Sequence, residues 1–141
     1  MYRLETYANG LPEEARRIRL EVFCTEQGYA PELEFDGDDA AALHAVVYDG
    51  QEAVATGRLI REGNGVFHLG RIAVRKPWRG RAAGRFLMEG LMELARRQGA
   101  HTFRLGAQVR ASGFYEKLGF HTVGAVYPDG HVPHVPMERQ A

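Results

Sequence analysis

The chain has 141 residues, with 18 basic and 18 acidic side chains, so its formal net charge at pH 7 is zero. Because the charges balance, the chain has no net electrostatic attraction to nucleic acid or anionic lipid. Apolar residues make up 45% of the chain, but they form no run long enough to span a membrane. The only cysteine, Cys24, excludes an internal disulfide. We therefore expect one cytoplasmic domain over residues 1–141, with no nucleic-acid partner and no membrane partner.

The first half of the chain predicts a strand, a helix and an antiparallel meander. Residues 2–7 alternate weakly, and a helix opens at Pro12-Glu13-Glu14, because proline and acidic residues favour a first helical turn. Three alternating segments separated by glycine-containing turns predict the strands of the meander, at residues 43–48, 53–60 and 66–74.

An acidic connection over residues 25–39 separates the helix from the meander. Connections of this length are uncommon unless they are functional or disordered. Its Asp36-Gly37-Asp38-Asp39 segment lacks the spaced oxygen ligands and the closing glutamate of a calcium loop, and we expect no metal site. Two interpretations stay open for this segment: an acidic wall for a cationic amine, or an ordinary solvated loop.

Residues 74–85 read as the end of a strand, a tight turn and the start of a helix. Gly80 lets the backbone turn so that the following N–H groups point at one spot, which suits an anion at the positive end of a helix. Arg79, Arg81 and Arg85 add charged donors for a phosphate. The spacing fits neither the P-loop nor the dinucleotide-binding pattern, and a basic turn before an ordinary helix is the simpler interpretation of the stretch by itself.

The second half of the chain predicts a crossover unit followed by two strands. A helix over residues 81–98 leads into a strand over residues 102–109, which the right-handed crossover rule makes parallel to the preceding strand. A short helix, residues 111–118, and two strands, residues 120–127 and 131–138, complete the chain. Two prolines in the last strand predict that it lies at an edge of the sheet.

Two motifs in this order carry a family resemblance. Arg79-Gly80-Arg81-Ala82-Ala83-Gly84 resembles the pyrophosphate loop of the GNAT N-acetyltransferase family, Arg/Gln-x-x-Gly/Ala-x-Gly/Ala. Phe114-Tyr115-Glu116-Lys117-Leu118-Gly119-Phe120 is similar to the late helix-to-strand segment of the same family. Further segments are similar to its ElaA-like branch, at residues 22–28, 34–36, 44, 56–59, 107–108 and 134–137.

The resemblance implies an α/β (α+β) fold that covers nearly the whole chain. That fold has a mixed, mostly antiparallel twisted sheet, a central parallel strand pair splayed around the cofactor, and helices on both faces. The implied acetyl donor is acetyl-coenzyme A, held by the turn, the preceding strand end and the late helix: Ile72, Ala73, Val74, Arg79, Gly80, Arg81, Ala82, Ala83, Gly84, Arg85, Phe114 and Tyr115.

Ala82 is a departure, because most members of the family carry glycine at this position. We expect the position to be helical already, where alanine is acceptable. A positive φ there would instead strain the loop.

The implied reaction is direct acetyl transfer to a primary amine while both substrates are bound. Tyr115 is the expected acid that protonates the departing thiolate. The general base stays open among Glu34, His134, His44 and Glu26, in that order. Residues expected at the acceptor are Glu26, Gln27, Glu34, Arg58 and Gln108.

The acceptor itself is not named by the sequence. It is a small-molecule or peptide primary amine, and acidic residues near the cleft favour a cation, such as a polyamine, an aminoglycoside-like sugar, a small metabolite or a protein amine. Two alternatives stay open: a catalytically weak coenzyme A-binding sensor or interaction module with the same fold, and an enzyme that uses a longer acyl thioester. A homodimer through the last strand or the meander edge is a further open arrangement.

Overall fold

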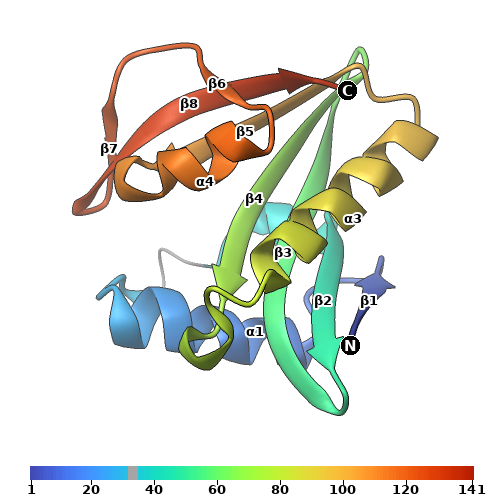
Figure 1. Cartoon of the computed structure of the whole chain (residues 1–141), viewed down its shortest axis with the longest axis vertical. Helices are drawn as coiled ribbons and strands as arrows, with labels where there is room; N and C mark the ends of the chain where they lie inside the picture. Colours follow the sequence, from blue (N-terminus) through green and yellow to red (C-terminus); the bar gives the residue numbers. More distant parts are fainter. Residues whose placement is uncertain (32–34) are drawn as a thin grey trace.

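A twisted, mixed sheet of eight strands organises the computed structural model, which describes residues 1–31 and 35–141 (Figure 1). Its order is β1-β2-β3-β4-β5-β8-β6, with β7 also paired to β8, and only the β4–β5 pair is parallel among the described residues. The strands are β1 Tyr2–Tyr7, β2 Leu43–Asp49, β3 Glu52–Gly63, β4 Val66–Val74, β5 Thr102–Gln108, β6 His121–Thr122, β7 Tyr127–Asp129 and β8 Val132–Gln140.

Helical segments cover both faces of this sheet and connect its strands. They are α1 Glu13–Arg19, η1 Leu20–Glu26, η2 Gly37–Ala40, η3 Lys76–Trp78, α3 Ala83–Arg97, η4 Val109–Ala111 and α4 Ser112–Lys117. None of the described helices is long and apolar enough to cross a bilayer. The mixed sheet with its single parallel pair confirms the fold predicted from the resemblance.

Both faces of the meander are buried, because its side chains alternate between two apolar layers. On β2, Ala45 and Val47 belong to the main core, which includes Leu87 and Leu91 of α3. Val46 points the other way and packs with Ala15 of α1. The helix α3 therefore lies on one face of the sheet, in front of β3 in Figure 1, and α1 lies on the opposite face.

The parallel strands β4 and β5 meet at one end and then separate. They pair only from Val66–Thr102 to His68–Arg104, although both strands continue beyond that point (Figure 1). A bulge in β4 turns it away: Arg58 pairs with Gly70, but Thr56 pairs with Ala73, which leaves one extra residue on β4. At this bulge Arg71 has a left-handed backbone, with φ of 51°. The divergence of the two strands opens the centre of the sheet.

Two predictions about the last strands were wrong. Residues 120–127 do not form one strand, because β6 and β7 are separated by an irregular segment. The last strand, β8, is not an edge strand, since it pairs with β5 on one side and with β6 and β7 on the other. Pro136 is accommodated because its carbonyl accepts from Val123 N–H, at 2.9 Å, on the side where the partner strand is interrupted.

The helix that begins after Pro12 runs further than its apolar spacing indicated. It continues as a π-helix over Leu20–Glu26, and this turn ends with Tyr29 N–H donating to Phe23 O at 2.9 Å. The first two residues of the acidic connection, Thr25 and Glu26, are therefore helical. Wide turns of this kind are frequent at functional sites, because they redirect side chains.

Candidate active site

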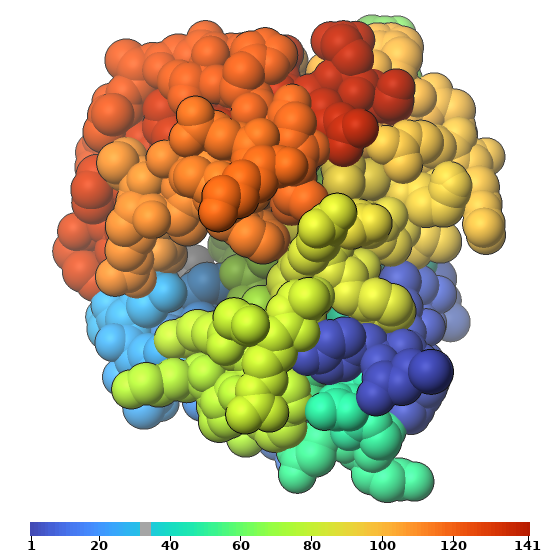
Figure 2. Space-filling model, viewed as in Figure 1, coloured from blue at the N-terminus to red at the C-terminus, as the bar shows by residue number. Residues whose placement is uncertain are grey.

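A cavity of about 600 Å³ occupies the opening between β4 and β5. Residues of β4 line one wall and residues of β5 the other, and side chains from η1, α4 and the β7–β8 hairpin complete it. In Figure 2 the surface is hollowed between the orange α4 and the yellow-green segment that leads into α3. The cavity thus passes through the sheet from the α3 face to the α1 face.

The turn before α3 is exposed at Gly80, and Arg79 is the one residue of the predicted loop, 79–85, that lines the cavity. Gly80 has a φ of 76°, and a Cβ added there would meet nothing within 4 Å. The helix starts at Ala83, and its first bond to the cap runs from Phe86 N–H to Ala82 O at 3.0 Å. The earlier N–H groups of this first turn therefore have no acceptor within the helix, as an anion-binding helix start requires.

Ala82 corrects the expectation of a helical backbone at this position. Its φ is 65° and its ψ is 11°, which is the left-handed region. Alanine at such a position costs about 1–2 kcal/mol, because its Cβ approaches the following carbonyl. The loop keeps the shape that glycine would adopt without this strain.

Gly84 explains how α3 can approach the strand end and the late helix. A Cβ at this position would lie 3.4 Å from Val74 Cγ2 and 3.2 Å from Phe114 Cζ. Phe114 in turn packs edge to face on Tyr115, with ring centroids 5.0 Å apart. Phe114 therefore lies next to both Gly84 and Tyr115, and it is not among the residues that line the cavity.

Three arginines of the predicted phosphate loop differ in their surroundings. Arg79 lines the cavity, where its Nε donates to Val74 O at 2.9 Å and its guanidinium pairs with Glu26 at 2.8 Å. Arg85 pairs with Glu89 on the surface of α3, at 2.7 Å. The carbonyl of Arg81 accepts from the Tyr2 hydroxyl at 2.8 Å, which ties the loop to β1. Only Arg79 of the three lines the cavity.

The end of β4 offers backbone groups to a ligand. Ile72, Ala73 and Val74, which were expected to hold the cofactor, all line the cavity. The edge of β4 that faces β5 has no strand partner here, because the β4–β5 pairing ends at His68. An extended, amide-containing ligand arm would fit along this edge by forming strand-like hydrogen bonds.

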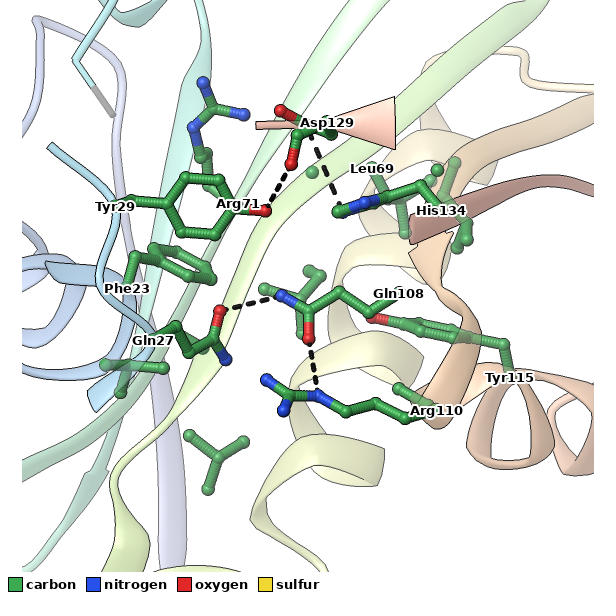
Figure 3. A pocket seen from close by; sticks show the side chains of 18 of the residues that line it. Phe23, Gln27, Tyr29, Leu69, Arg71, Gln108, Arg110, Tyr115, Asp129 and His134 are labelled. Carbon is green, nitrogen blue, oxygen red and sulfur yellow. Dashed lines mark hydrogen bonds and ion pairs between the residues drawn. The ribbon is translucent and has the colours of Figure 1, made fainter. Parts of the chain in front are cut away.

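Tyr115 lies on the α4 side of the cavity, with its ring almost fully buried and its hydroxyl directed inward (Figure 3). Burial raises the pKa of Tyr115 above its usual value, so the phenol keeps its proton at neutral pH. A protonated phenol at this position is suited to donate a proton to a group in the cavity.

A chain of polar side chains crosses the cavity between η1 and β5. Gln108 donates from Nε2 to Gln27 Oε1 at 2.7 Å, and Arg110 donates from Nε to Gln108 Oε1 at 3.0 Å (Figure 3). Glu26 lines the same wall. Three residues expected at the acceptor, Glu26, Gln27 and Gln108, are therefore brought together. Glu34, expected both as base and at the acceptor, lies outside the described residues.

His134 stands on β8 at the α1 end of the cavity. Its Nδ1 is 2.9 Å from Val132 O, and a carbonyl can only accept, so Nδ1 carries the proton and Nε2 of the neutral ring is an acceptor. Nε2 lies 3.8 Å from Asp129 Oδ2 (Figure 3). This arrangement gives the cavity a proton acceptor beside a carboxylate.

His44 and Arg58 are placed elsewhere, beneath α1, and neither is among the residues that line the cavity. The His44 ring is fully buried with its Nε2 2.8 Å from Asp39 O, and burial lowers the pKa of His44. Arg58 belongs to a group that we call the arginine cluster, which consists of Arg19, Arg58, Arg71, Asp36 and Asp39. A proton shuttle through His44 would have no direct path to a ligand.

The arginine cluster is closely bonded. Asp39 receives Arg19 Nη1 at 2.9 and 3.0 Å and Arg58 Nη1 at 2.9 Å. Asp36 receives Arg58 at 2.8 Å and Arg71 at 3.1 Å. The hydrogen bond from Arg58 is the main cause that lowers the pKa of Asp36 to about 2.

Several residues of the cavity were not found from the sequence. They are Phe23, Tyr29, His68, Arg71, Arg110, Tyr127 and Asp129. An Asp-Gly pair such as Asp129-Gly130 is by itself only a turn signal, and a left-handed arginine in a strand has no sequence signal. One signal was available at Gly106, where an added Cβ would collide with the Tyr127 hydroxyl; glycines inside strands often mark such close approaches.

Comparisons with known proteins agree with this architecture. The acetyltransferase (GNAT) domain family matches residues 9–141. ElaA of Escherichia coli is 30% identical over 129 residues, which cover 88% of this chain and 84% of ElaA. The uncharacterized N-acetyltransferase YjcF of Bacillus subtilis is 36% identical over 126 residues, covering 89% of each chain.

Solved structures give the same result. The crystal structure of E. coli ElaA superposes with a TM-score of 0.86 at 28% identity, covering 99% of both chains. An acyl-CoA N-acyltransferase from Pseudomonas aeruginosa superposes with a TM-score of 0.85 at 26% identity, again over 99% of both chains.

Proposed function

Since the chain belongs to the GNAT acetyltransferase family, with ElaA among its relatives, we propose that it transfers an acetyl group from acetyl-coenzyme A directly to a primary amine. The observation that carries this proposal is the cavity itself. It joins the end of β4 beside the α3 start to Tyr115 and His134, so a donor and an acceptor can meet between β4 and β5.

The residues near the loop fit the donor. The space beside Gly80 and the N–H groups at the start of α3 suit a pyrophosphate, and Arg79 adds a positive charge at the neighbouring cavity wall. The unpaired edge of β4 suits the amide groups of a pantetheine arm. The bound donor would supply a thioester carbonyl for attack. We take the acyl group to be acetyl, and the longer acyl thioester is the alternative donor.

The main chemical task of the protein in this reaction is to remove a proton from the amine. An alkyl ammonium with a pKa of about 10.4 must lose a proton to react at pH 7, which costs about 4–5 kcal/mol. Among the described candidates, His134 has an acceptor nitrogen at the cavity wall, whereas Glu26 is already paired with Arg79. We propose His134 as the base. The amine nitrogen then bonds to the carbonyl carbon while the carbon–sulfur bond breaks.

Tyr115 completes the reaction in this proposal. The departing thiolate, with a pKa of about 8.5, takes the phenolic proton of Tyr115, and the resulting phenolate takes the second proton that the amine nitrogen loses as the amide forms. The high pKa that burial gives to Tyr115 keeps this proton in place until the thiolate forms.

Thermal unfolding with and without acetyl-coenzyme A tests the donor site first. Acetyl-coenzyme A at a hundred times its dissociation constant should add about 2.7 kcal/mol to the free energy of unfolding, which corresponds to a rise in Tm of several degrees. We expect the Arg79→Glu, Arg81→Glu double variant to lose this rise. Arg97→Glu, at the other end of α3, is the matched charge-reversal control and should keep it.

Thiol release with a panel of primary amines then tests the transfer. Amine-dependent release of coenzyme A supports the proposed enzyme. Binding of acetyl-coenzyme A without release for any amine would favour the coenzyme A-binding sensor, and the absence of any Tm rise in the folded protein would contradict the donor site.

A further inference from the structure

Asp129 is a charged residue at the acceptor end of the cavity that has no role in the mechanism described above. The inference drawn from it rests on the proposed function. Its carboxylate faces His134 Nε2 at 3.8 Å, from the neighbouring strand β7 (Figure 3). We call Asp129 and His134 the acceptor pair. Its separation leaves room for a nitrogen atom that contacts both the carboxylate and the ring.

The negative charge of Asp129 is not neutralised by a permanently charged partner among the described residues. In the described part of the chain its one charged partner is His134, which is charged only when protonated. The other described carboxylate at the cavity wall, Glu26, is paired with Arg79, and Asp36 nearby is held by Arg58 and Arg71. Among the described residues that line the cavity, Asp129 is therefore the carboxylate that is not paired with an arginine.

Three aromatic side chains line the cavity near the acceptor pair: Phe23, Tyr29 and Tyr127. The Tyr29 hydroxyl donates to Asp129 O at 2.8 Å, and the Tyr29 ring meets Phe23 edge to face at 6.5 Å. Tyr127 packs against the His134 ring, with centroids 5.8 Å apart. Aromatic faces attract ammonium groups and also bury the apolar body that carries them. A second positive charge on the acceptor would not be favoured, because Arg71 and Arg110 also line the cavity.

We propose that the acceptor pair is the amine-binding centre: Asp129 binds the ammonium group, His134 Nε2 takes its proton, and the acceptor is a primary amine on an aromatic or apolar body. The proton leaves the amine nitrogen for Nε2, and the resulting imidazolium is stabilised by the Asp129 carboxylate. The neutral amine keeps its lone pair for the carbonyl carbon. Asp129 thus serves both to bind the substrate and to position its proton acceptor.

Steady-state acetylation of 2-phenylethylamine tests the proposal. We expect Asp129→Asn to raise KM for this amine about tenfold to a hundredfold, since a hydrogen bond to a charged group is lost, and to leave the Tm rise with acetyl-coenzyme A unchanged. The exchange keeps the shape of the side chain and the Asp-Gly turn. Asp38→Asn removes the same charge from an exposed position outside the cavity and should leave KM unchanged.

His134→Gln separates binding from proton transfer. This variant should lower kcat and flatten the acid limb of kcat against pH, with a smaller change in KM. The other charged or titratable side chains that line the cavity are Glu26, Tyr29, His68, Arg71, Arg79, Arg110, Tyr115, Tyr127 and Asp129. An acid limb that survives in His134→Gln would assign the proton acceptor to another of these groups.

The outcomes distinguish this inference from the proposed function. If acetyl-coenzyme A raises Tm but the wild-type protein does not acetylate 2-phenylethylamine, or if Asp129→Asn matches Asp38→Asn in KM, the inference is overturned and the donor site stands. If acetyl-coenzyme A does not bind, the proposed function itself fails.

Discussion

The arginine cluster and the acceptor pair lie on the same face of the sheet but are built in opposite ways. In the cluster, Arg19 is fully buried and Asp39 is almost fully buried. Each carboxylate there accepts more than one hydrogen bond from arginine side chains. In the acceptor pair, the Asp129 side chain is 55% exposed and stands beside a histidine that is charged only when protonated. Arg71 connects the two, since it contacts Asp36 and also lines the cavity.

This difference separates charges that hold the fold from charges that can act on a ligand. A buried ion pair is costly to break, because its remaining partner is left as an uncompensated buried charge. An exposed carboxylate with no permanent cation costs little in the free protein and gains a partner when a substrate binds. Substitutions in the two groups should therefore change different measurements.

The largest change in stability should come from Asp39→Ala. Its removal leaves Arg19 and part of Arg58 without their carboxylate, and we expect a loss of about 3–5 kcal/mol in the free energy of unfolding. Urea denaturation followed by circular dichroism measures this loss. Asp38→Ala, one position before it and exposed, should change the free energy by no more than about 0.5 kcal/mol. Equal effects would show that the cluster is not a stabilising unit.

Tyr115→Phe should give the reverse result, with activity lost and stability kept. The phenol has no hydrogen bond to lose within the described protein, so the folded state should be little affected. Removal of a general acid should lower kcat about a hundredfold, the low end of such effects, because a thiolate is a good leaving group. The Tm rise with acetyl-coenzyme A should stay. An unchanged kcat would remove Tyr115 from the mechanism.

Acid should weaken the arginine cluster through Asp36. The folded pKa of Asp36 is lowered from 3.8 to about 2 by the hydrogen bond from Arg58, so its contribution is present above pH 4 and is lost as pH falls toward 2. Because 36% of the side chain is exposed, we discount this contribution to about 1 kcal/mol. Urea midpoints at pH 5 and pH 2.5 measure it. Asp36→Asn should lessen the difference between the two.

The smallest effect should be a gain from Ala82→Gly. Relief of the left-handed strain exceeds the extra chain entropy of glycine, and the net stabilisation should be about 0.5 kcal/mol. Thermal unfolding measures it, and Ala95→Gly within α3 is the opposite control, which should destabilise. A loss of stability in Ala82→Gly would contradict the strain at this loop.

The sequence predicted the donor side of the molecule better than the acceptor side. The donor loop is local: Gly80, Gly84 and the following helix pattern lie within one continuous stretch, so the order of strand, turn and helix could be predicted there. Ala82 was the exception, since a left-handed alanine is not visible in a sequence. The acceptor side is assembled from β4, β7, β8 and η1, so Asp129 could be recognised only once the strands were paired.

The π-helix and the bulge in β4 escaped prediction for the same reason. Both insert one extra residue into a regular pattern, and this changes which side chains point into the cavity without changing composition or spacing elsewhere. His44 and Arg58 were misplaced with respect to the cavity because alternation gives the face of a strand but not what covers that face. Here α1 covers it.

The contacts that close the acceptor side join segments that are far apart along the chain. Tyr29 contacts Asp129 across 100 positions, and His131 contacts Gln27 across 104. A ribosome makes the chain from its N-terminus, so η1, the donor loop and α3 all exist before the residues that close this wall. Contacts between residues so far apart in sequence also form late in folding, because the entropy of closing the long loop is lost before the contacts can stabilise the chain. A growing chain therefore carries the turn before α3 for some time before the wall that contains Asp129 can close.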